Sequence, residues 1–127
     1  MTDHAQECFD KYLTNAKFAQ SLEAQFANDL AWSCVVRFYA ALHLVNAYLI
    51  DKRNVKLDTA TAAHLERKRA MDACPELRDA PRKYRELKDL SERVRYDATY
   101  VYTPEHHQKS KSLLGKIVAI VEPKLKR

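Results

Sequence analysis

The sequence is very poor in glycine: Gly115 is the only glycine among 127 residues, and there are four prolines. β-Hairpins and phosphate-cradling loops depend on glycine, so this composition argues against a sheet and against a Gly-rich nucleotide loop. Alanine, leucine, lysine, arginine and glutamate are abundant, and these residues favour helix. A chain of this length is typical of one domain. We therefore predict a single all-α domain over residues 1–127, an up-and-down helical bundle of about five helices.

Metal-binding and export signals are also missing from the sequence. The three cysteines, Cys8, Cys34 and Cys74, contain no Cys-x2-Cys pair and are odd in number. This pattern argues against a zinc site and favours small buried side chains in a reducing compartment. We expect no metal site and no cofactor. The first residues lack the basic-then-apolar pattern of a secretory signal, so a cytoplasmic location is the expectation.

Residues 30–50 form the most apolar stretch of the chain. Arg37 and His43 interrupt it before an apolar run reaches the ~18 residues of a membrane span, so we predict a buried central helix and no membrane contact. One stripe of this helix carries aromatic and polar groups: Trp32, Tyr39, His43 and Asn46. Two interpretations of the stripe stay open. Its polar groups bond to neighbouring helices inside the core, or it lines a ligand site or a subunit interface.

The other helices are predicted from helical spacing and from start and stop residues. We expect helices over 3–22, about 62–73, about 80–102 and from 104 to Pro123, with the central helix ending near Asp51. The expected caps are Asn28 or Asp29, Thr61, Asp79 and Thr103. A buried seam is expected along Tyr84, Leu87, Ser91, Val94, Ala98 and Val101. Residues 122–127 are expected to be a basic tail.

Positive charge gathers in the second half of the chain. Residues 104–127 hold six basic and two acidic side chains, whereas residues 1–63 hold six and seven. The formal net charge is +5. A polyanion partner such as RNA or a nucleotide is compatible with this distribution, and so are solvated lysines and arginines on helix faces.

Two segments carry a resemblance to a known family. VVRFYAALHLVNAYL (35–49) and LKDLSERVRYDATYVY (87–102) resemble the two signatures of the HEPN family, small helical domains of prokaryotic toxins, defence proteins and nucleotidyltransferase partners. His64 stands where many members carry a histidine after a loop. The resemblance covers roughly residues 20–121. It implies a helical bundle, a homodimer and a role in a toxin, defence or stress system.

Catalytic members of this family are similar to one another in an Arg-x4-6-His motif and act as metal-independent endoribonucleases. Arg95 matches the arginine, and Tyr102 matches a tyrosine that often follows the motif. Tyr100 stands where the histidine could be. A free tyrosine has a pKa near ~10 and a free histidine near ~6.5, so Tyr100 is a poor proton shuttle at neutral pH. Cleavage of RNA is therefore left open, while binding of RNA or a nucleotide is expected.

The resemblance and the helical spacing together define the candidate site residues. Residues seven apart share a helix face, so Arg95 should align with Tyr102, and Arg93 with Tyr100. The catalytic candidates are Arg95, Tyr100 and Tyr102. The candidates for contact with RNA or a nucleotide are Arg93, Asp97, His43 and His64. Two alternatives stay open: an ordinary charge ladder on this helix, and a non-catalytic module that dimerises or docks on a partner protein such as an antitoxin or a nucleotidyltransferase.

Overall fold

The computed structural model describes every residue except 26–29, 58–59 and 126–127. Within the described residues the chain forms five α-helices and a short 3₁₀ turn, with no strand. The elements are α1 (Asp3–Gln25), α2 (Ala31–Arg53), α3 (Ala60–Asp72), η1 (Pro75–Leu77), α4 (Ala80–Tyr96) and α5 (Pro104–Leu125). The prediction of an all-α helical bundle is confirmed.

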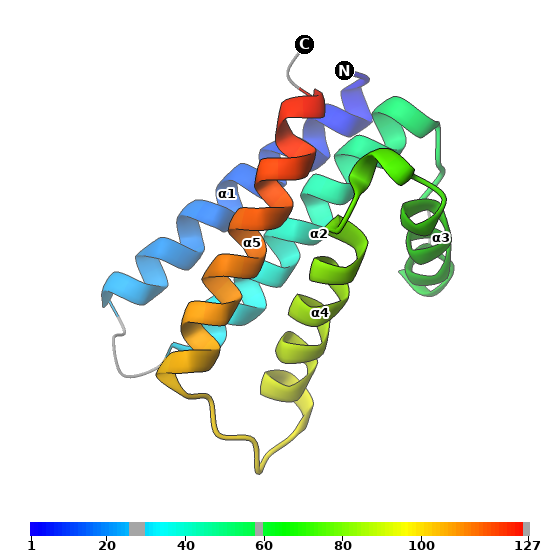
Figure 1. Ribbon diagram of the computed structural model, residues 1–127. Helices are drawn as coiled ribbons and strands as arrows, with labels where there is room; N and C mark the ends of the chain where they lie inside the picture. Colours follow the sequence, from blue (N-terminus) through cyan, green and yellow to red (C-terminus); the bar gives the residue numbers. More distant parts are fainter. Residues whose placement is uncertain (26–29, 58–59, 126–127) are drawn as a thin grey trace.

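The helix α2 lies at the centre of the bundle, with α1, α4 and α5 packed around it (Figure 1). Thirteen of its 23 residues are buried. By length and composition α2 could cross a membrane, but 78% of its most apolar window is buried inside the bundle, as in the core helix of a folded domain. The core side chains include Phe38, Leu44, Leu87, Ile117 and Val121. The three cysteines are free and buried, as predicted.

The helix α3 stands beside this bundle and packs only lightly on α2 and α4 (Figure 1). The chain returns from α3 through η1, where Leu77 is fully buried. Glu76 next to it accepts hydrogen bonds from Arg53 at 2.8 Å and 2.9 Å and from the Tyr48 hydroxyl. These contacts anchor the return of the chain, so α3 is held near the bundle and an open groove is left between it and α4.

The helix α4 ends at Tyr96, so the prediction that it runs to residue 102 is wrong. The carboxylate of Asp97 accepts hydrogen bonds from the backbone N–H of Thr99 at 3.0 Å and from its hydroxyl at 2.7 Å. Such a local bond offers the backbone an alternative to the helix ladder. The predicted seam is buried through Ser91 and half-buried at Val94, but Ala98 and Val101 are exposed.

Other predicted boundaries differ by a few residues. α1 and α2 both run further than expected, and α2 stops where Asn54 adopts a left-handed conformation with φ of 53°. Thr61 lies inside α3 and does not cap it. Asp79 is at the N-cap of α4 without a side-chain capping bond. α5 passes through Pro123 because the buried Leu125 extends its packing into residues predicted as a tail. Asn28 and Asp29 lie outside the described residues.

Thr103 caps α5 as predicted. Its hydroxyl oxygen accepts a hydrogen bond from the backbone N–H of His106 at 3.2 Å, and the backbone N–H of Thr103 donates to His106 Nδ1 at 3.1 Å. This is a capping box in which histidine replaces the usual glutamate.

Replacing Thr103 by alanine is expected to lower the free energy of unfolding by about 1 kcal/mol, because one orphan N–H at the start of α5 loses its acceptor. Urea denaturation measures this change. Thr14→Ala, on the exposed face of α1, is the control and should stay within about 0.5 kcal/mol. Equal midpoints for wild type and Thr103→Ala would contradict the capping role.

Candidate nucleic-acid interface

A groove of about 610 Å³ opens between α2, α3 and α4. We call it the α3–α4 groove. Its volume lies in the ~300–1,000 Å³ range of small-molecule sites. The polar and aromatic lining residues are Tyr39, His64, Arg67, Lys88, Glu92, Arg95 and Tyr96, and the apolar ones are Phe38, Leu42, Leu57 and Ala63. The lining therefore combines three cations, one acid and exposed aromatic rings.

Arg95 lies over aromatic rings at one side of this groove. Its Nη1 donates to the Tyr39 hydroxyl at 3.0 Å and its Nε donates to the Ser91 carbonyl at 3.4 Å. Its guanidinium carbon lies 5.0 Å from the centre of the Tyr96 ring and 5.6 Å from that of Tyr39. Among the described residues no carboxylate pairs with it. The positive charge is held in place by ring stacking and is available to an anion.

Arg67 is the second cation of the groove without a carboxylate partner among the described residues, and it is only 4% exposed. Its Nε donates to the side-chain oxygen of Asn46 at 2.7 Å. No ion pair joins it to a carboxylate in the part of the chain that the structure describes. A buried charge without a counter-ion is unfavourable by several kcal/mol, and proteins normally pair such groups. The arrangement around Arg67 thus favours contact with an anionic group.

His64 lies three residues before Arg67, and its Nδ1 is 3.3 Å from Arg67 Nη1. Because a guanidinium only donates, Nδ1 must accept, and the imidazole proton is on Nε2. Burial lowers the pKa of His64, and the charges of Arg67, Lys88 and Arg95 lower it further, although Glu92 opposes them. A neutral imidazole with Nε2–H as donor is the form that this setting favours near neutral pH.

Lys88 is partly neutralised within the groove, because its Nζ pairs with Glu92 at 3.0 Å. It lies seven residues before Arg95 and therefore shares a face of α4 with it. The structure thus brings the predicted residues Arg95 and His64 to one groove. It adds Arg67, Lys88, Tyr39 and Tyr96, of which the sequence analysis named only Tyr39, as part of a stripe.

Arg93 and Tyr100 meet in a separate cluster. The Arg93 guanidinium lies 5.9 Å from the Tyr100 ring centre, and the Tyr100 ring stacks on His106 with ring centres 5.2 Å apart. These three residues line a different depression, which does not include Arg95. The predicted pairing of Arg93 with Tyr100 is found, but through a loop and not along one helix. The motif spacing from Arg95 to Tyr100 does not place the two side chains together.

The remaining candidates also lie outside the groove lining. Asp97 is exposed and forms the turn after α4. His43 is half-buried in α2, and burial, with smaller effects from Lys11 and Arg67, lowers its pKa. Tyr102 lies in the connection to α5, so the prediction that it shares a face of α4 with Arg95 is wrong.

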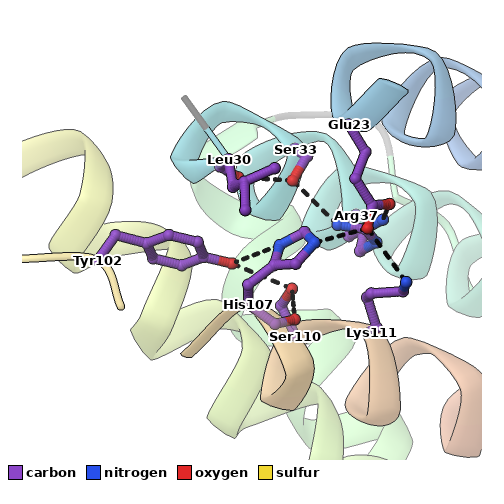
Figure 2. A network of polar contacts seen from close by, with 8 residues as sticks. All are labelled: Glu23, Leu30, Ser33, Arg37, Tyr102, His107, Ser110 and Lys111. Carbon is purple, nitrogen blue, oxygen red and sulfur yellow. Dashed lines mark hydrogen bonds and ion pairs between the residues drawn. The ribbon is translucent and has the colours of Figure 1, made fainter. Parts of the chain in front are cut away.

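Tyr102 belongs to a network that joins the start of α5 to α1 and α2 (Figure 2). Its hydroxyl donates to the Ser110 hydroxyl at 3.2 Å and lies 3.5 Å from His107 Nδ1. Glu23 is the centre of the network. Its carboxylate contacts Arg37 Nη2 at 2.6 Å, His107 Nε2 at 2.7 Å and Lys111 Nζ at 3.1 Å. Both imidazole nitrogens of His107 are engaged, so we interpret the network as a structural tie.

The described residues contain no group of three or more His, Cys, Asp or Glu side chains able to hold a metal ion. The chemistry of the α3–α4 groove is accordingly that of cations, aromatic rings and one imidazole. Such a surface stabilises phosphate oxygens and stacks bases. Comparisons of the chain with protein-family models, with curated proteins and with solved structures found no match.

Proposed function

We propose that this chain is a HEPN-type domain that binds RNA in the α3–α4 groove. The observation that carries the proposal is the pair Arg67 and Arg95, two cations that line one open groove without a carboxylate partner among the described residues. Guanidinium groups match phosphate geometry through two parallel N–H donors. A phosphate bound there would supply a counter-ion, which Arg67 does not have among the described residues.

The aromatic residues of the groove favour a nucleic acid over a simple anion. Tyr96 is 77% exposed and Tyr39 is 38% exposed. Both rings border the cationic site, where unpaired bases can stack on them. The substrate class is therefore a phosphodiester with accessible bases.

Cleavage of the bound RNA stays a prediction. His64 supplies an imidazole in the groove at the side of Arg67, whereas Tyr100 lies in another cluster. A ribonuclease activity would thus depend on His64 and not on Tyr100. The Nδ1 atom of His64 is engaged by Arg67, so the removal of a proton from a 2′-hydroxyl by this atom would require that bond to break. The homodimer also stays a prediction.

The proposal is tested by fluorescence anisotropy with a labelled single-stranded oligouridylate, for wild type and Arg95→Ala. We expect the variant to bind about fivefold to tenfold more weakly, because a charge-assisted contact is lost at a partly exposed site. The logarithm of wild-type affinity should fall linearly with the logarithm of salt concentration.

Arg82→Ala, which changes an exposed arginine of α4 outside the groove lining, is the matched control and should bind like wild type. Two results would contradict RNA binding here: full affinity of Arg95→Ala, or a flat salt response. Either would favour the alternative of a module that docks on a partner protein.

A further inference from the structure

A smaller cavity of about 200 Å³ adjoins the α3–α4 groove. We call it the Lys68 cavity. Its polar lining consists of His64, Lys68, Tyr84, Arg85, Lys88 and Asp89. His64 and Lys88 also line the groove, so the two depressions meet at these side chains. The cavity is below the ~300 Å³ typical of a whole small-molecule site, and it suits one group such as a phosphate.

One cation of the Lys68 cavity is free to contact an anion. Arg85 is paired with Asp72 at 3.0 Å and Lys88 with Glu92 at 3.0 Å. Lys68 has no ion pair among the residues that the structure describes, so its charge is available. Asp89 is the one acid of the lining and opposes an anion. Because these partners neutralise Arg85 and Lys88, Lys68 is the lining cation that an anion can contact.

A buried hydroxyl group gives a second indication of a ligand. Tyr84 is 5% exposed, and its hydroxyl makes no hydrogen bond of ordinary geometry with the described residues. Burial raises the pKa of Tyr84, whereas the charge of Arg67 and its close contact with the hydroxyl oppose this rise. Because a guanidinium only donates, that contact leaves the hydroxyl proton without an acceptor among the described residues. Buried hydroxyl groups are normally hydrogen-bonded, and an unpaired one is unfavourable by about 1–3 kcal/mol. A phosphate oxygen in the cavity would accept its proton.

We infer that the Lys68 cavity is a second phosphate subsite, so that the ligand is single-stranded RNA spanning at least two phosphates and not a mononucleotide. This inference rests on the proposed function of the groove. One phosphate would lie between Arg67 and Arg95, and the neighbouring phosphate would contact Lys68 and the Tyr84 hydroxyl. His64 and Lys88 would lie between the two.

The test measures binding of two probes, 5′-UMP and a single-stranded octauridylate, to wild type, Lys68→Ala, Tyr84→Phe and Arg95→Ala. Lys116→Ala, on an exposed position of α5, is the control. Lys68→Ala should bind the octamer about fivefold more weakly, reduce its salt slope by about one, and leave 5′-UMP affinity unchanged. Tyr84→Phe should weaken octamer binding while its melting temperature is equal to or above that of wild type, because the unpaired hydroxyl is removed.

The outcomes separate this inference from the proposal on which it rests. Suppose that Lys68→Ala and Tyr84→Phe both bind the octamer like wild type, while Arg95→Ala binds it more weakly. This result would overturn the second subsite but would still support RNA binding in the α3–α4 groove. An equal loss for 5′-UMP and octamer in Lys68→Ala would also overturn the second subsite, because a single subsite would explain both. Wild-type affinity in Arg95→Ala as well would overturn RNA binding in the groove itself.

Discussion

Replacing Arg67 by methionine is expected to stabilise the free protein and to weaken RNA binding, two effects of opposite sign. The melting temperature should rise by about 3–5 °C, which corresponds to about 1 kcal/mol. Affinity for a single-stranded oligouridylate should fall about tenfold to a hundredfold, the range for hydrogen bonds to a charged group. Replacing an arginine that only stabilises the fold would not give both results together.

The reason lies in the surroundings of Arg67. Its side chain is 4% exposed, and its described hydrogen bonds are to Asn46 and His64, which are neutral near pH 7. Methionine fills a similar volume without a buried charge, so the desolvation penalty disappears. The lost bond to Asn46 offsets part of this gain. In the proposed RNA complex the same substitution would remove a cation that contacts phosphate.

Differential scanning calorimetry and fluorescence anisotropy measure the two effects of Arg67→Met. Arg69→Met, at an exposed position in the last turn of the same helix, is the matched control. It should change neither the melting temperature nor the affinity for RNA by much. A lower melting temperature together with unchanged affinity would mean that Arg67 is an ordinary structural residue.

Replacing Glu23 by glutamine is expected to lower the free energy of unfolding at pH 7 by about 3 kcal/mol. Glutamine keeps the size of the side chain but removes the charge, which leaves Arg37 with 4% exposure and no described counter-ion. Breaking one partner of a buried pair typically costs about 3–5 kcal/mol, and the 25% exposure of Glu23 places this pair at the lower end.

The same variant should lose part of the acid sensitivity of the fold. Burial alone would raise the pKa of Glu23, but hydrogen bonds from His107, Lys111 and Arg37 outweigh it and lower the pKa to about 2. A carboxyl whose pKa is lower in the folded state stabilises the fold above its unfolded pKa of 4.5. That contribution is lost as the pH falls from about 4.5 to about 2.

Urea denaturation of wild type and Glu23→Gln between pH 7 and pH 2.5 measures this contribution. The difference in unfolding free energy should be largest at pH 7 and should shrink below pH 4.5. Glu66→Gln, exposed on α3, serves as the control. A difference that is independent of pH would show that the Glu23 charge does not stabilise the fold.

The arrangement of helices was predictable because the apolar residues of 30–50 leave little choice but burial at the centre of the bundle. The end of α4 was not predicted. The periodic pattern continues formally to Val101, yet the Asp97–Thr99 bonds turn the chain after Tyr96. The sequence Asp97-Ala98-Thr99 favours a local turn, but the prediction gave more weight to the helical periodicity.

The groove was only partly predictable. Arg95 and His64 were named from the sequence, but their meeting depends on how α3 lies beside α4, which local spacing does not determine. The sequence pattern indicated only weakly that Arg67 and Lys88 belong to the site, because they share helix faces with His64 and Arg95 respectively. The Glu23–His107 contact joins residues 84 positions apart and had no signal in the sequence pattern. Tyr100 and Tyr102 were separated from Arg95 by the early end of α4.

Titration of the His64 imidazole by NMR, without RNA and with saturating octauridylate, tests the groove most directly. In the free protein the His64 pKa should lie below the ordinary value of 6.5. A phosphate bound beside it favours the imidazolium, so RNA should raise this pKa. The signal of His4, which does not line the groove, is the internal reference. A rise confined to His64 would support RNA binding in the α3–α4 groove, and an unchanged His64 titration with saturating RNA would contradict it.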